Sequence, residues 1–143
     1  MYYGRSPSAI RSSIAAQQRA LAQQQARNRR LDADIARLED AKARVDAIYW
    51  EDRGLADWVG AYDAGASWQG DRRERFEEVK RDAKSQADAY CDSVNEIYRA
   101  ICNKITQLEN ERADGLGAVS WAYQCLNSLE NELSWAVRNW DNG

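Results

Sequence analysis

The stretch that decides the fold is residues 31–49, which read LDADIARLEDAKARVDAIY. Its apolar residues recur at alternating spacings of four and three, with one lysine in the same series: Leu31, Ile35, Leu38, Lys42, Val45 and Tyr49. This is the heptad pattern by which one α-helix packs along another. The stretch therefore predicts a long amphipathic helix that pairs with a second helix.

The same series continues toward the N-terminus, where polar residues enter it. Its earlier members are Ile10, Ile14, Gln17, Leu21, Gln24 and Asn28. A polar residue in such a series fixes register and partner at some cost in stability. Upstream, Ser6 can cap a helix and Pro7 suits its first turn, so we predict a helix over about residues 8–52.

After residue 52 the pattern changes phase. A second apolar series, one position out of step with the first, comprises Ile48, Leu55, Trp58, Val59 and Tyr62. Gly54 and Gly60 interrupt it, which predicts a kink or a short separate helix over about 54–64. Residues 64–70, AGASWQG, are the first clear break, with a turn expected at 67–70.

A second helix is predicted over about 71–113, with Asp71 as its cap and Glu74 completing a capping box. Its expected core series is Phe76, Lys80, Ala83, Ala87, Tyr90, Val94, Ile97, Ile101, Lys104 and Leu108. Residues 114–117, DGLG, suggest another break, followed by a C-terminal helix over about 117–140. The predicted fold is all-α: one domain over 1–143, an elongated antiparallel, coiled-coil-like helical hairpin with an additional C-terminal helix.

Composition argues against catalysis. The chain has 143 residues, no His, and three Cys without a Cys-x-x-Cys pair, which removes the usual metal, redox and triad chemistries. Paired carboxylates such as Glu77 and Glu78 fall on faces expected to be wet, and no glycine-rich phosphate loop is present. We therefore predict a protein that is not an enzyme and takes neither cofactor nor metal.

The charge and hydropathy of the sequence limit the classes of partner that we expect. The net charge is -3, although residues 1–31 carry six Arg and no acid. These arginines scatter around the helix without interleaved aromatic residues, so a solvated face or an acidic partner is expected in place of nucleic acid. The N-terminus lacks the apolar segment of a Sec signal and no stretch could span a bilayer. We expect a cytoplasmic chain without stable membrane insertion.

Six tryptophans are the unusual feature of the composition. Trp50, Trp58 and Trp68 fall around the first turn. Trp121, Trp135 and Trp140 belong to the last predicted helix. Two interpretations stand side by side: packing on helices of the same chain, or anchoring a partner protein, where Trp is enriched.

The turn Trp68-Gln69-Gly70 between two heptad helices, with Phe76 early in the second, resembles the WXG-motif family of type VII secretion in Gram-positive bacteria. The resemblance covers about residues 8–112, and the stretch from Ser67 to Leu108 looks most like the YwqH-like members, which accompany LXG-type toxins. The resemblance implies a secretion-recognition role for Trp68 and Gly70, and we predict Phe76 as a further recognition residue. The Tyr-x-x-x-Asp/Glu export signal of many family members has no match here, so the chain would either be exported with a partner or stay inside the cell as a chaperone-like adaptor.

The resulting hypothesis is a non-catalytic binding partner or targeting factor of a larger type VII-secreted, LXG-like effector, forming a hetero-oligomer through paired helices. The residues expected to face the partner helix are Leu21, Leu31, Ile35, Leu38, Tyr90, Ile97 and Ile101. The alternative is a cytoplasmic homo-oligomeric coiled-coil scaffold, in its simplest form a homodimer. It shares the heptads but needs nothing special at Trp68.

Overall fold

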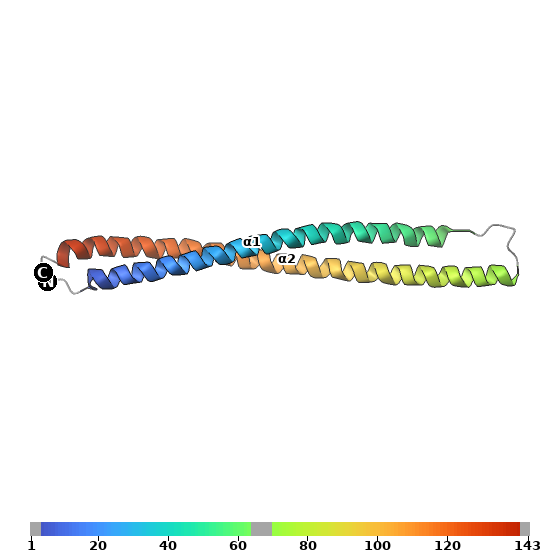
Figure 1. Cartoon of the computed structure of the whole chain (residues 1–143), viewed down its shortest axis with the longest axis horizontal. Helices are drawn as coiled ribbons and strands as arrows, with labels where there is room; N and C mark the ends of the chain where they lie inside the picture. Colours follow the sequence, from blue (N-terminus) through green and yellow to red (C-terminus); the bar gives the residue numbers. More distant parts are fainter. Residues whose placement is uncertain (1–3, 64–69, 141–143) are drawn as a thin grey trace. The chain divides into compact units, whose positions relative to one another are not determined.

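The computed structural model describes residues 4–63 and 70–140 and shows a helical hairpin (Figure 1). Helix α1 covers Pro7–Ala61 and helix α2 covers Asp71–Trp140. No strand occurs in the described ranges. The prediction of an all-α hairpin is confirmed. Residues 67–69 of the predicted turn lie outside the described residues.

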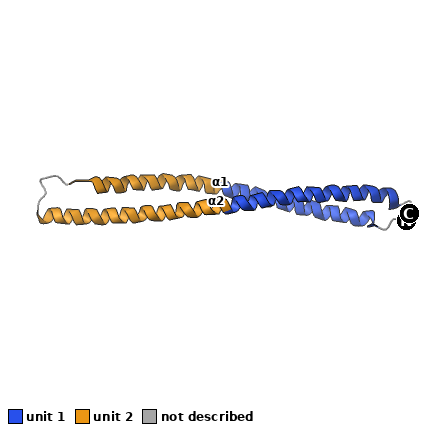
Figure 2. Ribbon diagram, turned by 180° about the vertical axis from the view of Figure 1, so that it is seen from behind, with its two compact units in different colours: residues 1–35, 107–143 blue, residues 36–106 orange. Residues whose placement is uncertain are grey.

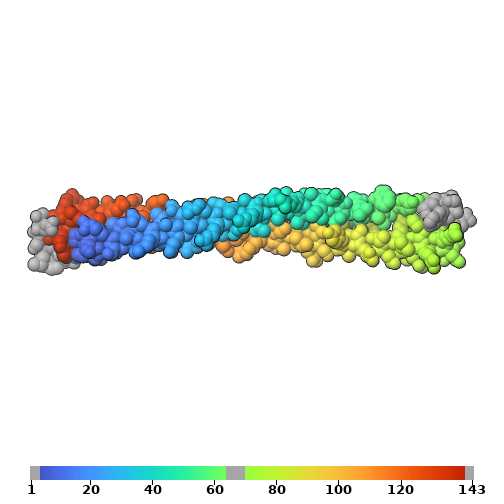
Figure 3. All heavy atoms as spheres, in the orientation of Figure 1, coloured from blue at the N-terminus to red at the C-terminus, as the bar shows by residue number. Residues whose placement is uncertain are grey.

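The chain divides into two compact units, and each helix contributes to both (Figure 2). Unit 1 contains residues 1–35 and 107–143, and unit 2 contains residues 36–106. In unit 1 the start of α1 lies against the end of α2, as the blue and red atoms of Figure 3 show. In unit 2 the second half of α1 packs antiparallel on the first half of α2.

The ends of both helices follow from local sequence. The Ser6 hydroxyl accepts a hydrogen bond from the Ala9 amide at 3.2 Å, which confirms the cap predicted before Pro7. At α2 the capping residue is Gly70, whose carbonyl accepts hydrogen bonds from the amides of Arg73 and Glu74. Gly70 has a φ of 70°, a conformation that glycine adopts without strain. Asp71, predicted as the cap, is instead the first helical residue.

The heptad series predicted for α1 faces α2 along its whole length. Ile10, Leu21 and Ile35 are buried, Asn28 is the buried polar member, and the remaining members are half-buried. In unit 1 a small core forms where Leu21 meets Ala122 and Leu126, with Ile14 and Val119 packed beside them. The pattern of residues 10–49 thus identified the packed face of α1 correctly.

The kink predicted around 54–64 is absent, because α1 continues through both glycines to Ala61. The core keeps its original phase through Ala56, which is fully buried, and the predicted out-of-phase series stays exposed apart from the half-buried Val59. A glycine costs a helix about 1 kcal/mol, which continued packing on α2 offsets. Gly60 also makes room for Lys84, since a Cβ there would lie 2.9 Å from its Cδ and Cε.

The predicted break at 114–117 is also absent, so no separate C-terminal helix exists. Gly115 is buried, and a Cβ at this position would meet the side chains of Asn28 and Gln24. This glycine therefore serves a close approach between the helices, while Gly117 has open space around it. The apolar series predicted to form the packed face of the C-terminal helix ends with Trp140, which is exposed. Its other members are buried or half-buried against α1: Val119, Ala122, Leu126, Leu129, Leu133 and Ala136.

For the first half of α2 the predicted core series is half right. Ala87, Val94, Ile101 and Leu108 face α1 as expected. At the other core positions, the residue that faces α1 comes one position later in the sequence than the predicted one. These residues are Glu77, Lys84, Cys91, Tyr98 and Ile105. Tyr90 and Ile97, predicted as core residues, are exposed. A parallel row of apolar residues beside the true core produced this error.

Candidate functional site

Unit 2 carries a continuous set of exposed apolar side chains that the intramolecular core leaves uncovered. We call it the apolar face. Its members on α1 are Ile48, Leu55 and Trp58, with Tyr62 directly after the end of that helix, and its members on α2 are Phe76, Val79, Tyr90 and Ile97. Phe76 is half-buried, and the others keep between 42% and 62% of their surface exposed. None of the eight carries a charge.

The two rows lie on the same side of unit 2. On each helix the row runs one residue ahead of the core: Leu55 precedes buried Ala56, and Tyr90 precedes buried Cys91. Because the helices are antiparallel, residues that precede the core on either helix fall on one side of the pair.

Aromatic contacts join the two rows where α1 ends and α2 begins. The rings of Tyr62 and Phe76 have centroids 5.8 Å apart, and the ring of Trp58 lies 5.4 Å from that of Tyr62. The distances suit tilted aromatic packing. The indole of Trp58 nevertheless keeps most of its surface exposed, so the cluster covers the end of the core without closing the face.

The opposite side of unit 2 is polar. The Asp88 carboxylate lies 3.5 Å from Arg53 and 3.2 Å from the Lys84 ammonium. An open hollow beside it is lined by Gly60, Lys80, Lys84, Asp88 and Asp92 among others. These partly exposed ion pairs contribute little to stability. The charged side and the apolar face give unit 2 two chemically distinct surfaces.

The buried thiol of Cys91 sits in the core of unit 2. Burial raises the pKa of this thiol, and the nearby Asp52 carboxylate raises it further. One oxygen of Asp52 is buried without a hydrogen-bond partner. A thiol with a raised pKa is a poor nucleophile, so Cys91 behaves as a small core residue. Cys91, Cys102 and Cys125 are all free.

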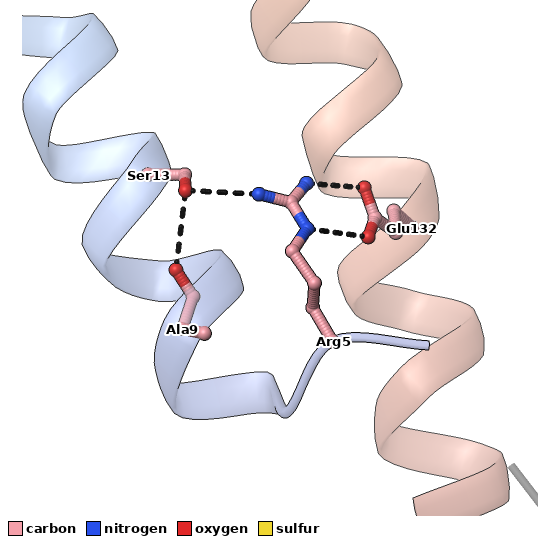
Figure 4. Close-up of polar contacts among 4 residues, drawn as sticks. All are labelled: Arg5, Ala9, Ser13 and Glu132. Carbon is pink, nitrogen blue, oxygen red and sulfur yellow. Dashed lines mark hydrogen bonds and ion pairs between the residues drawn. The ribbon is translucent and has the colours of Figure 1, made fainter. Parts of the chain in front are cut away.

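Unit 1 has an ion pair where α1 begins. The Arg5 guanidinium donates two hydrogen bonds to the Glu132 carboxylate, at 3.1 and 2.7 Å, and a third to the Ser13 hydroxyl (Figure 4). The hydrogen bond from Arg5 holds the pKa of Glu132 below its usual value. A second pair joins Arg112 to Asp32 at 3.4 Å. Inside unit 1, the first pair ties the segment before α1 to α2, and the second ties α1 itself to α2.

Five of the six tryptophans lie in the described residues, and all five are exposed: Trp50, Trp58, Trp121, Trp135 and Trp140. Trp50 makes an edge contact with Tyr49, with centroids 5.3 Å apart. The structure thus leaves the indoles largely outside the core. Their role as anchors for a partner stays a prediction.

The residues predicted to contact a partner helix separate into two groups. Leu21, Leu31, Ile35, Leu38 and Ile101 pack inside the hairpin. Phe76, Tyr90 and Ile97 lie on the apolar face. Gly70 is exposed at the start of α2, and Trp68 lies outside the described residues. The structure therefore moves the candidate surface away from the core series.

Sequence reasoning missed part of the apolar face. Val79 belongs to no predicted series, and the sequence predicts the Ile48 series as a change in the phase of the core. The sequence did contain a signal for this face: each helix carries two apolar rows, and each row has seven-residue spacing. Such a double row is typical of a helix that contacts more than one neighbour.

The described residues also bear on metal binding and on membrane crossing. Among them, no group of three or more His, Cys, Asp or Glu side chains is placed to hold a metal ion. Within the same ranges, neither helix contains a stretch apolar enough to cross a bilayer.

A comparison with protein-family models finds a match to this chain. A family model described as YwqH-like matches residues 12–131. The match extends well beyond residue 112, where the resemblance in the sequence ended, and into the part of α2 that the prediction had treated as a separate helix. Comparisons with curated proteins and with solved structures find no match.

Proposed function

The chain belongs to the YwqH-like family, and from this premise we propose that it is a non-catalytic binding partner of a larger, type VII-secreted, LXG-like effector. It would act as a targeting factor that associates with the effector through paired helices. The sequence contains no His, which gives no basis for His-dependent catalysis, although Glu77, predicted on a wet face, is half-buried against α1.

The observation that carries this proposal is the apolar face of unit 2. Soluble monomers rarely leave so many large apolar side chains exposed on one surface. Here the α1–α2 core is already complete without them, since Ala56, Cys91, Val94 and Ile105 fill it. An exposed heptad row beside a finished core is the surface that a further helix would cover.

A tagged full-length chain recovered from its native cells tests the proposal. We expect mass spectrometry to identify one large protein that co-purifies in a fixed ratio and has a helical region. A parallel preparation from cells that express the untagged chain controls for adhesion to the resin. Recovery of the wild-type chain with no partner in cells that express type VII effectors would contradict the proposal.

The second candidate is a homo-oligomeric scaffold, which the same exposed rows support. Two copies could cover each other's faces and form a four-helix bundle. Light scattering of the purified chain across a concentration series separates the two candidates. A stable dimer that excludes added effector would favour the scaffold.

A further inference from the structure

We propose that the apolar face of unit 2 binds one amphipathic helix of another protein, whose apolar stripe is flanked by Lys or Arg side chains. This inference rests on the proposed function and states the chemistry of the partner segment. Three features of the face support it: its area, its spacing and the charge along its edges.

The exposed area of the apolar face is close to the area that each partner buries in a specific protein interface. A large side chain offers roughly 150–250 Å² of surface, so the seven exposed members of the face present on the order of 700 Å². A standard interface buries about 800 Å² on each partner, and the largest patch on an ordinary monomer is about 300–600 Å². The face is therefore large enough to hold a partner stably.

The spacing fits a single helix lying between the two rows. Ile48 and Leu55 on α1 and Tyr62 just beyond it stand seven residues apart, as do Tyr90 and Ile97 on α2. Two antiparallel rows with this repeat present apolar side chains between which the heptad side chains of a third helix can pack. At 1.5 Å per residue the rows extend about 20–30 Å, which corresponds to a partner helix of about 20 residues.

The edges of the face are acidic. When the core residues are written as heptad positions a and d, the members of the face fall at positions g and c, and its outer edges fall at positions c and f. Over residues 48–62 and 76–97, the charged residues at positions c and f are Glu51, Asp82 and Glu96, and all three are exposed. The nearest basic residues at these positions, namely Arg44, Arg72 and Arg75, fall beyond the ends of the face.

This charge pattern selects among occupants. A helix with Lys or Arg beside its apolar stripe would place positive charge along both acidic edges. A second copy of the chain would instead bring its own acidic edges against the same ones, where like charges repel. Charge complementarity therefore favours a basic helix from a different protein over self-association.

Two designed peptides test the proposal with the full chain. Each has about 21 residues and Leu at positions a and d; one carries Lys at e and g, and the other carries Glu there. We expect the Lys peptide to bind in a one-to-one ratio, at least about tenfold more tightly than the Glu peptide. Raising the salt concentration should narrow this difference, because the edge charges are exposed.

Matched variants locate the site. Trp58→Ala and Leu55→Ser lie on the face, and we expect each to weaken Lys-peptide binding about tenfold. Trp121→Ala and Leu116→Ser are the controls, since Trp121 is 65% exposed against 61% for Trp58, and Leu116 is 58% exposed against 57% for Leu55. Both controls lie in unit 1 and should bind the peptide as the wild-type chain does.

Several outcomes would overturn the inference. Equal binding of the two peptides would remove the charge argument. Equal losses in the unit 1 controls, or binding of many peptides per chain, would indicate non-specific adhesion. A dimer that dissociates in Trp58→Ala would identify a second copy as the occupant.

Failure of this inference can be told apart from failure of the proposed function. If Trp58→Ala and Leu55→Ser still recover the effector from cells, the proposed function stands and the site is elsewhere. If the wild-type chain recovers no effector but binds the Lys peptide at the face, the site stands and the proposed partner is wrong.

Discussion

The side-chain amide of Asn28 packs directly on the backbone of α2 at Gly115, in the core of unit 1. A Cβ on residue 115 would lie 3.0 Å from the Asn28 Cγ and 3.0 Å from the Gln24 Nε2, and would meet the Asn28 Oδ1 atom even more closely. The Gln24 amide donates a hydrogen bond to that oxygen at 2.9 Å. A buried polar layer thus requires glycine on the facing helix.

Replacement of this glycine tests the requirement. Gly115→Ala should cost about 1–3 kcal/mol through overpacking, because the new methyl group displaces the Gln24–Asn28 pair. The gain in helix propensity, about 1 kcal/mol, offsets part of this cost, so the free energy of unfolding should fall by up to about 2 kcal/mol. Chemical denaturation followed by circular dichroism measures the difference.

Gly117→Ala is the matched control for this substitution. A Cβ at 117 has nothing within 4 Å, so we expect a stabilisation of about 0.5–1 kcal/mol from helix propensity alone. If both alanine variants were stabilised equally, the close approach at Asn28 would not exist in solution.

The contrast between the two glycines shows where sequence reasoning stops. The heptad series of α1 predicted its packed face because alternating three- and four-residue spacings admit one interpretation there. Gly115, by contrast, is read as a helix break when seen alone. Its neighbour Asn28 lies far away in the chain, and only the pairing of the helices brings the two together.

The register of α2 has a similar explanation. Tyr90 and Ile97 form one apolar row, and Cys91 and Tyr98 form another beside it. Both have seven-residue spacing, and the first is more hydrophobic, so the sequence favoured it. The row of α2 that packs in the core depends on which row fits the residues of α1. The row with Tyr90 and Ile97, which the sequence predicts as core, is instead part of the exposed candidate site.

Alanine substitutions at two isoleucines test this register. Ile105 is 6% exposed and Ile97 is 54% exposed. Ile105→Ala should therefore cost about 2–5 kcal/mol of unfolding free energy through loss of packing. Ile97→Ala should change it by less than about 0.5 kcal/mol. The reverse order in a denaturation experiment would restore the register that the sequence predicted.

The Arg5–Glu132 pair makes the stability of unit 1 depend on pH. Because the folded chain lowers the pKa of Glu132 from its ordinary value of 4.5, the stabilisation is present above pH 4.5 and is lost as the pH falls through the folded pKa. Arg5→Ala should thus melt at a lower temperature than wild type at pH 7. The two proteins should melt together in strong acid.

The control for the ion pair is Arg44→Ala, which removes a pair on the surface of α1 alone. Arg44 and Asp40 lie 2.9 Å apart within that helix. A difference in melting temperature between Arg5→Ala and wild type that persisted unchanged at low pH would show that Arg5 acts through packing and not through the Glu132 carboxylate.

The three thiols should differ in reactivity. Cys91 is buried and its pKa is raised, whereas Cys102 and Cys125 are half-buried. With excess iodoacetamide at pH 8, we expect Cys91 to be modified more slowly than the other two, at a rate limited by opening of the hairpin. Peptide mass spectrometry over time measures each site. Unfolding in guanidinium should abolish the difference, and equal rates in the folded chain would place Cys91 outside the core.

Replacement of Trp68 tests whether the turn serves recognition or only connects the two helices. Trp68→Ala should leave the helical content and the melting temperature unchanged while reducing recovery of the effector or its export. The reason is that a large aromatic side chain at a partner surface contributes chiefly to binding. Trp50→Ala, on α1, compares the loss of Trp68 with the loss of an indole outside the turn. If Trp68→Ala recovers and exports the effector as the wild type does, the turn is a simple connection, and recognition must be sought on the apolar face of unit 2.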